Sequence, residues 1–215
     1  MASVATPERG GHPARAVLLW GALGAAVAVP VLIALFSPLL EWRGPIYIAG
    51  GFAGMLALGA LLAQPLLAAN ALPGPSPAQA RRWHARLGTA IVALVVAHVV
   101  GLWVTSPPDV IDVLLFRSPT PFSVWGAVAM WAVFAAGLLA ATRRRLRWRP
   151  RTWRRAHAAL AAVTVGATAA HALLIEGAMG TGSKAALCAA VVAATAWAVL
   201  RSRARRAAPD TPTPR

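Results

Sequence analysis

The sequence predicts an all-α fold, a polytopic membrane bundle of six helices with both termini in the cytoplasm. Three observations support this prediction: the composition, six long apolar segments and the distribution of positive charge. Hydrophobic residues make up 58% of the 215 positions and charged residues only 13%, and the mean hydropathy is +0.62. A chain so apolar is neither an ordinary soluble domain nor a disordered one. The lipid bilayer is therefore its first expected partner.

Six apolar segments each approach the roughly 20 residues needed to cross about 30 Å of hydrocarbon. They are expected near 15–36, 46–69, 84–105, 122–141, 155–175 and 184–200. The first follows Arg9 and Arg15 and so resembles a signal peptide, but its apolar run from Ala16 to Phe36 exceeds a typical signal core. No small-x-small cleavage pattern follows it. We therefore expect a retained helix, bent at Pro30.

The linkers between these segments are short and rich in helix breakers. They read "SPLLEWRGP", "NALPGPSPAQ", "SPPDVIDVLLFRSPTP" and "EGAMGTGSK". Abundant alanine and glycine within the segments suits close packing of membrane helices. The expected organisation is a cytoplasmic tail (1–14), a six-span transmembrane domain (15–200) and a disordered basic C-terminal tail (201–215).

Positive charge predicts the orientation of the bundle. Counted on alternate sides of the six segments, 18 of the 21 Lys and Arg residues fall on the side of the two chain ends. The other side holds only Arg43, Arg117 and Lys184, together with four of the six acidic residues. Because positive residues stay on the cytoplasmic side, we expect both termini inside a cell inner (plasma) membrane.

The basic run "RRRLRWRPRTWRR" raises the question of nucleic-acid binding, given the net charge of +15. A basic loop between two spans is what cytoplasmic orientation and anionic lipid headgroups require. The loop is also too short for a DNA-binding fold. We therefore expect no nucleic-acid partner, and Trp148 and Trp153 in this run are interpreted as part of the interfacial aromatic belt.

Cysteine chemistry is limited to one residue. Cys188 is the single cysteine of the chain and lies in an apolar run. It can form no intramolecular disulfide and no cysteine-based zinc or iron–sulfur site. We interpret it as an inert membrane-facing or packing residue.

Four of the five histidines form two pairs with one spacing. His84 and His98 lie in the third segment and His157 and His171 in the fifth, fourteen positions apart in each case, whereas His12 lies in the N-terminal tail. At about 100° per residue, the second side chain returns to within about 40° of the first, roughly 21 Å further along the axis. Ionisable residues inside a membrane usually mark a functional site. One histidine of each pair is thus expected near each edge of the hydrocarbon.

The spacing restricts what these histidines can bind. Because the third and fifth segments run in the same direction, His84 and His157 share the cytoplasmic level and His98 and His171 the outer level. Zinc or copper at either level would lack further ligands, since these segments hold no Cys, Asp or Glu. A haem iron needs only two axial ligands from protein. The residues therefore predict two stacked bis-histidine haems, which are b-type because the Cys-x-x-Cys-His signature is absent.

Alternative roles must be weighed for the histidines and for the polar residues near them. A lone membrane histidine more often bridges helices by hydrogen bonds, but the repeated spacing favours ligands. Five arginines at the cytoplasmic level are candidate partners for haem propionates, although the positive-inside rule explains them equally well: Arg81, Arg82, Arg86, Arg154 and Arg155. Glu176 and Trp103 are interpreted as interface residues rather than proton carriers.

Two stretches of the sequence resemble a known family. "RRWHARLGTAIVALVVAH" and "TWRRAHAALAAVTVGATAAH" resemble the haem-binding helices of the ferric reductase-like transmembrane domain. That superfamily includes ferric reductases, NADPH oxidases and the haem-binding subunit of bacterial periplasmic methionine sulfoxide reductase. The resemblance extends over about residues 15–200, and it implies that His84, His98, His157 and His171 are the axial ligands.

The sequence also departs from ferric reductases and NADPH oxidases. In those proteins a flavin- and nicotinamide-binding region follows the last span, whereas here only "RSRARRAAPDTPTPR" remains, without a glycine-rich phosphate loop. We therefore expect electrons from a separate donor, a flavoprotein carrying FMN or a membrane quinol. The methionine sulfoxide reductase subunit is similar in lacking such a region.

The sequence thus predicts a membrane cytochrome b, an electron-transfer component of an oxidoreductase. It would relay electrons from the inner haem to the outer haem and on to an extracytoplasmic acceptor, either ferric ion or a periplasmic reductase partner. A quinone-linked four-histidine cytochrome b subunit is the nearest alternative. A non-haem transporter or assembly protein remains open as another class, although a transporter would normally show further polar residues along a path.

Overall fold

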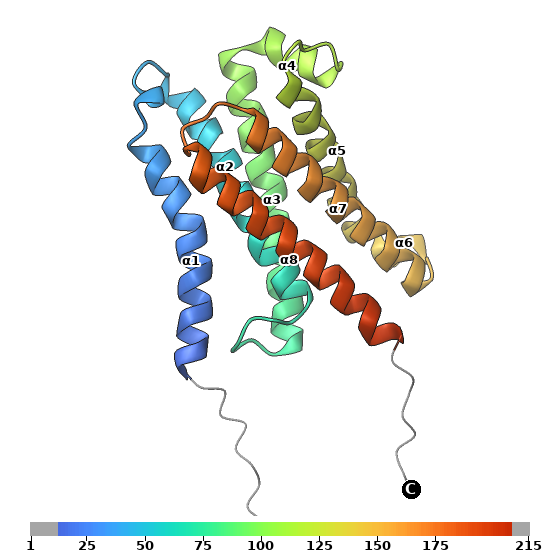
Figure 1. The fold of residues 1–215 in the computed structure, drawn as a ribbon. Coiled ribbons are helices and arrows are strands. Elements are labelled where there is room, and N and C mark those ends of the chain that lie inside the picture. Colours follow the sequence, from blue (N-terminus) through green and yellow to red (C-terminus); the bar gives the residue numbers. More distant parts are fainter. Residues whose placement is uncertain (1–12, 208–215) are drawn as a thin grey trace, which may run out of the picture.

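The computed structural model describes residues 13–207, and six long helices account for the six apolar segments (Figure 1). These are α1 (Pro13–Leu35), α2 (Pro45–Ala68), α3 (Pro77–Thr105), α5 (Pro121–Ala141), α7 (Pro150–Leu174) and α8 (Thr181–Ala207). Three short elements lie in the linkers: η1 (Pro38–Leu40), α4 (Pro107–Leu114) and α6 (Arg143–Leu146). The described residues form no strand, so the all-helical prediction is confirmed. His12 and most of the expected N-terminal tail lie outside the described residues.

Proline sets the start of most of these helices. Helices α2, α3, α4, α5 and α7 all begin with proline, which lacks the N–H that would be unpaired there and has a φ suited to the first turn. At the start of α3, the Ser76 hydroxyl accepts from the Gln79 N–H, and the Gln79 side chain accepts from the Ser76 N–H. This capping box starts α3 seven residues before the expected boundary at residue 84. Hydropathy detects only the part of the helix that lies in lipid, and α3 extends seven residues beyond that part at its N-terminal end.

The last helix is longer than expected. Residues 201–207 were assigned to a disordered tail, but α8 continues through them to Ala207. Alanine and arginine favour helix, and the Arg201 guanidinium lies over the Trp197 ring, 4.9 Å from its centroid. The remaining tail, residues 208–215, lies outside the described residues.

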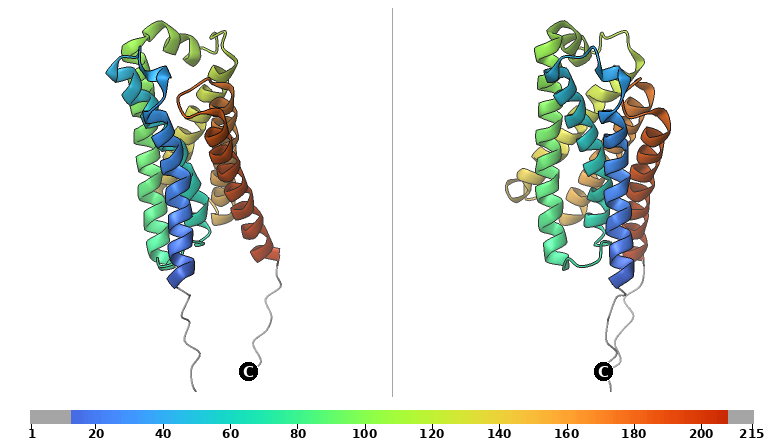
Figure 2. Two further views of the ribbon diagram at one scale, coloured as in Figure 1. Left: turned by 60° about the vertical axis from the view of Figure 1, so that its left-hand side comes forward. Right: turned by 90° about the vertical axis from the view of Figure 1, so that its left-hand side faces the viewer.

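The long helices alternate in direction, so α3 and α7 are parallel (Figures 1 and 2). Helix α2 packs on α3 and α5 packs on α7, and α8 contacts both α2 and α7. By contrast, α3 and α7 are not packed directly on each other. Four of the six long helices therefore form two antiparallel pairs, and the histidine-bearing helices of the two pairs, α3 and α7, face each other across the interior.

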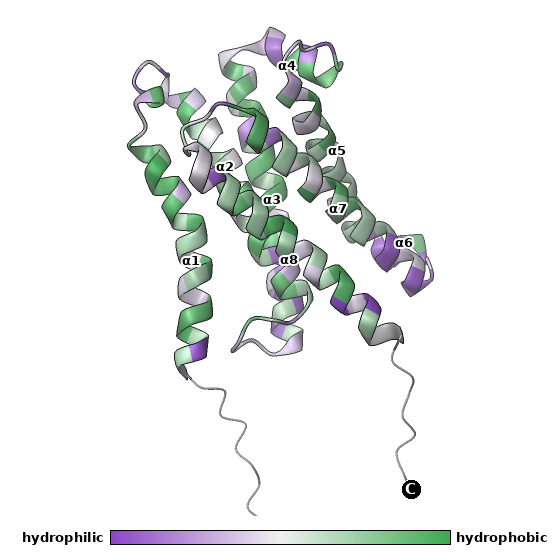
Figure 3. Cartoon of the chain, in the orientation of Figure 1, coloured by the Kyte–Doolittle hydropathy of each residue, from purple (hydrophilic) through white to green (hydrophobic). Residues whose placement is uncertain are grey.

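The two ends of the bundle differ in charge. At one end, hereafter the arginine-rich end, α3 and α7 begin, and Arg81, Arg82, Arg154 and Arg155 are exposed there. The start of α1 and the end of α8 lie at this same end (Figure 1). Figure 3 shows hydrophilic residues at the helix ends and in α6, and hydrophobic residues along the spans. The first span thus begins, and the last span ends, at the same end of the bundle, as an even number of spans requires.

Small residues bring α2 and α3 together, and a core of apolar side chains fills the bundle. A Cβ added to Gly101 would lie 2.9 Å from the Cα of Gly50, so the two backbones touch as small-residue packing of membrane helices allows. Cys188 is 1% exposed within the core, which identifies it as a packing residue. The core is formed chiefly by Ala34, Leu58, Leu61, Leu62, Ile91, Val133, Val165, Leu187 and Val191.

The outer surface of the helices is apolar. Large side chains such as Val17, Leu18 and Leu138 are exposed by about two thirds or more of their area. A soluble monomer rarely exposes apolar surface on this scale, whereas lipid tails cover it without cost. Together with the six spans, this surface identifies a multi-pass membrane protein.

Candidate functional site

The fold brings the four span histidines together as two pairs. His84 and His157 lie at the arginine-rich end, where their ring centroids are 6.2 Å apart and their planes meet at 74°. Fourteen residues further along each helix, His98 on α3 and His171 on α7 form the second level, at the end opposite the arginines. All four side chains are only half-buried although they face the interior. This partial exposure follows from the lack of direct packing between α3 and α7.

Three of the four imidazoles are held by a backbone carbonyl of the neighbouring helix. The Nδ1–H of His98 donates to the Gly50 carbonyl at 2.8 Å, that of His171 to the Phe122 carbonyl at 2.9 Å, and that of His84 to the Gln64 carbonyl at 3.2 Å. A carbonyl oxygen can only accept, so the proton must be on Nδ1. The Nε2 lone pair of each ring is then free to bind a metal or accept a proton.

Glycine makes room for the two imidazoles at the end opposite the arginines. A Cβ at Gly54 would lie 2.9 Å from Nδ1 of His98, and a Cβ at Gly126 would lie 2.8 Å from Nδ1 of His171. Each glycine is four residues after the carbonyl that holds the same ring, Gly50 on α2 and Phe122 on α5. A side chain there would block the ring from the carbonyl. The two helix pairs thus use one arrangement twice.

His157 is held differently. Its Nδ1 is buried and has no hydrogen-bond partner among residues 13–207. Instead, the Trp153 indole stacks flat on the imidazole, with centroids 5.1 Å apart and an interplanar angle of 7°. Trp153 is therefore not simply part of an interfacial belt, as its place in the basic run suggested.

One layer of side chains separates the two histidine levels. Ile91 lies seven positions from both His84 and His98, and Thr164 lies seven positions from both His157 and His171. Seven residues bring a side chain back to within about 20° of its starting direction, so each lies on the histidine face of its helix. Both are buried, at 2% and 5% exposure. The Thr164 hydroxyl has no partner within the described residues.

The five arginines proposed as propionate partners are all exposed. They lie on α3 and α7, near His84 and His157 in the sequence: Arg81, Arg82, Arg86, Arg154 and Arg155. Glu176 and Trp103 are exposed at the opposite end, as expected of interface residues.

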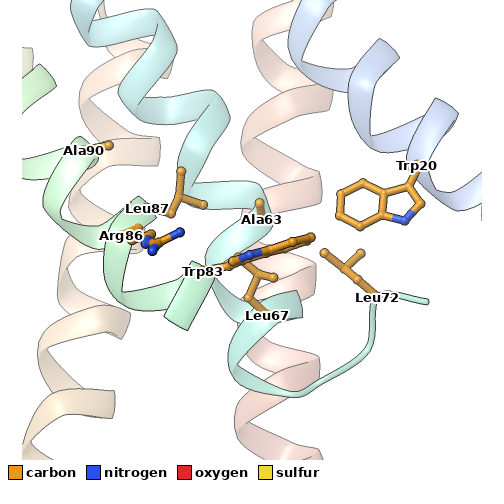
Figure 4. Close-up of a pocket in the computed structure, with 8 residues that line it drawn as sticks. All are labelled: Trp20, Ala63, Leu67, Leu72, Trp83, Arg86, Leu87 and Ala90. Atoms are coloured by element: carbon orange, nitrogen blue, oxygen red, sulfur yellow. The ribbon is translucent and has the colours of Figure 1, made fainter. Parts of the chain in front are cut away.

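A shallow cleft of about 450 Å³ lies beside α3 at the arginine-rich end (Figure 4). Trp20 from α1 and Trp83 from α3 meet edge to face in it, with ring centroids 6.4 Å apart. Its lining is almost wholly apolar, and Arg86 is the charged residue at its edge. Trp83 immediately precedes His84, so the cleft and the first histidine pair lie on adjacent faces of the same turn of α3, about 100° apart.

The donor set at each level is two imidazoles. Within residues 13–207, no group of three or more His, Cys, Asp or Glu side chains is placed to hold a metal ion.

The fold and this site define a helical multi-pass membrane protein with paired histidines inside the bundle. The sequence matches the family described as the ferric reductase like transmembrane component over residues 52–168, more than half of the chain. The chain belongs to this ferric reductase-like family. The matched region contains His84, His98 and His157, and His171 lies three residues beyond it. Comparisons with curated proteins and with solved structures found no match.

Several residues of the site were missed by the sequence analysis. Gly54 and Gly126 face histidines of other helices, and nothing in their local sequence marks that contact. Gln64, whose amide donates to the His84 carbonyl at 3.2 Å, was likewise unmarked. Trp153 could have been found, because residues four apart on a helix are neighbours and it precedes His157 by four.

Proposed function

We propose that the protein is a membrane cytochrome b that relays electrons across the bilayer through two b-type haems. His84 and His157 would hold one iron, and His98 and His171 the other. The observation that carries this proposal is the placement of two imidazole pairs on parallel helices of a ferric reductase-like domain. The electrons would come from a separate donor and leave to an extracytoplasmic acceptor, ferric ion or a reductase partner.

The residues present fit haem. Two metal–nitrogen bonds of about 2 Å plus two ring radii of roughly 1 Å add up to about 6 Å, and the His84 and His157 centroids are 6.2 Å apart. Carbonyl anchors on Nδ1 leave Nε2 free in three of the four rings. Porphyrin supplies four ligands to the iron, so the two imidazoles at each level are enough to complete its coordination.

A bound haem supplies an iron that accepts and passes on one electron at a time. The protein's own contribution is positional and electrostatic. The carbonyls of Gly50 and Phe122 fix the tautomer and direction of their histidines and raise ligand basicity. Ile91 and Thr164 keep water out of the interval between the levels. The exposed arginines supply positive charge for carboxylates at their end.

A quinol is the donor that the cleft favours. Its apolar lining suits a quinone ring and isoprenoid tail, and Arg86 can donate to a quinone oxygen. The cleft also adjoins the turn of α3 that carries His84. A flavoprotein with FMN would instead dock on the exposed arginines, where its phosphate finds cationic partners.

Haem content tests this proposal directly. We expect purified protein to contain two haems per chain by the pyridine haemochrome assay, with a low-spin spectrum typical of two imidazole ligands. A transporter or an assembly protein, whose histidines only bridge helices, would purify colourless. A colourless protein after expression with ample haem supply would therefore overturn the cytochrome proposal.

The orientation is proposed from charge, with the arginine-rich end in the cytoplasm of a plasma membrane. Trp42 is 89% exposed at the opposite end, Trp148 is 46% exposed at the arginine-rich end, and the native Cys188 is buried. In spheroplasts, a membrane-impermeant maleimide should label the Trp42→Cys variant and should label Trp148→Cys only after permeabilisation. The reverse pattern would show that the bundle is inserted the other way round.

A further inference from the structure

We propose that a stack of Arg143, Trp153 and His157 positions the His157 imidazole and gives the haem site at the arginine-rich end the higher reduction potential of the two. Here this stack is called the Arg–Trp–His stack. The inference rests on the proposed function, because it takes His157 as an iron ligand. It goes beyond that function by assigning a role to two residues outside the ligand set.

The stack replaces an anchor that His157 lacks. The other three histidines each donate Nδ1–H to a helix carbonyl, whereas the buried Nδ1 of His157 has no partner within the described chain. An imidazole without this bond can rotate about its Cβ–Cγ bond. The flat contact with Trp153, at 5.1 Å and 7°, restricts that rotation by ring packing instead.

Trp153 is itself held from two sides. Its indole N–H donates to the Leu139 carbonyl of α5 at 3.1 Å, which fixes the ring relative to a second helix. On the ring, the Arg143 guanidinium of α6 lies 4.6 Å from the centroid, within cation–π distance. The indole that stacks on His157 is therefore held by a second helix and by a cation, and is not a freely moving interfacial side chain.

This arrangement affects the two haem sites unequally. A histidine that donates Nδ1–H to a carbonyl is the more basic ligand and stabilises ferric iron. Both anchors at the opposite end are short, 2.8 and 2.9 Å, whereas the arginine-rich end has one longer bond of 3.2 Å and one ring with none. Arg143 adds positive charge, which disfavours the more positive ferric state. Both effects raise the potential of the site that contains His157. Outward transfer from this site then runs against the difference between the two midpoints, and the acceptor and the membrane potential must drive it.

The ring geometry provides a spectroscopic readout. The His84 and His157 planes meet at 74°, and nearly perpendicular axial imidazoles give ferric haem a strongly anisotropic low-spin EPR signal. Rotation of either ring changes this signal. Loss of bundle stability alone would instead reduce both haem signals together.

The experiment compares Trp153→Leu, Trp153→Phe and Arg143→Gln in the full chain by EPR and potentiometric titration. We expect Trp153→Leu to broaden or shift one of the two low-field signals and to lower the higher of the two midpoints, or to lose that haem alone. Trp153→Phe keeps an aromatic plate and should restore the signal. Arg143→Gln should lower the same midpoint and leave the signal unchanged, because it removes the charge while the Leu139 carbonyl still holds the indole.

A second cation–π pair in the chain provides the matched control. Arg201 lies over Trp197 on α8, and neither forms a ring contact with a histidine among residues 13–207. Trp197→Leu and Arg201→Gln should leave both signals and both midpoints at wild-type values. Two normal haems in Trp153→Leu, or equal effects in the control pair, would overturn the proposed role of the stack. Absence of haem from the wild-type protein would instead refute the cytochrome function itself.

Discussion

Alanine at His98 or His171 should reduce the haem content from two per chain to one. Each substitution removes one of the two imidazoles at the level opposite the arginines, and a haem with one protein ligand is held far more weakly. His84→Ala and His157→Ala should each remove the other haem. The pyridine haemochrome assay gives the stoichiometry, and potentiometric titration shows which of two midpoints disappears.

The control for these variants is His12→Ala, since His12 lies outside the predicted spans. It should retain two haems and both midpoints. Two residues on different helices should give the same loss when they share a level, so His98→Ala and His171→Ala should lose the same midpoint. If all four single variants kept two haems with unchanged spectra, these histidines would not be the ligands.

Gly54→Ala and Gly126→Ala should disturb the same haem as His98→Ala, although neither glycine can bind iron. The added methyl would lie under 3.0 Å from Nδ1 of the adjacent imidazole, so ring or helix must move. Overpacking of this kind typically costs about 1–3 kcal/mol. Movement of the ring also breaks its bond to the carbonyl of Gly50 or Phe122. We expect a shifted midpoint or lost haem at that level only.

Glycines without close neighbours provide the comparison. A Cβ at Gly51 on α2 or at Gly166 on α7 would meet no atom within 4 Å. The Gly51→Ala and Gly166→Ala variants should therefore retain both midpoints, and they gain slightly in helix propensity. The steric explanation is wrong if Gly54→Ala and Gly51→Ala give the same spectra and the same thermal stability.

Much of this architecture could be predicted because the membrane simplifies the sequence signal. Span number follows from apolar length, and the histidine levels follow from helical rise along α3 and α7. Helix ends were less well predicted. Hydropathy placed the start of the third span at 84, whereas the Ser76 capping box starts α3 at Pro77.

Contacts between helices account for most of what the sequence did not reveal. That Gly54 faces His98 depends on the rotation of α2 against α3, which no local pattern encodes. One of the linkers rich in helix breakers holds α4, and the hydroxyl of its N-cap residue Ser106 donates to Asp109 in the first turn at 2.6 Å. Trp153 precedes His157 by four residues, a spacing that predicts contact on a helix, but the basic residues around it favoured the interpretation as an interfacial side chain.

The layer of Ile91 and Thr164 has a further consequence for energy conversion. A layer that excludes water between the two levels would let electrons tunnel but give protons no route, so each transfer in the proposed function would move net negative charge across most of the membrane. One elementary charge crossing the full membrane changes its free energy by about 2.3 kcal/mol per 100 mV. The membrane potential, negative inside, would then drive electrons outward. Turnover would partly discharge that potential, and a protonophore would slow the electron transfer.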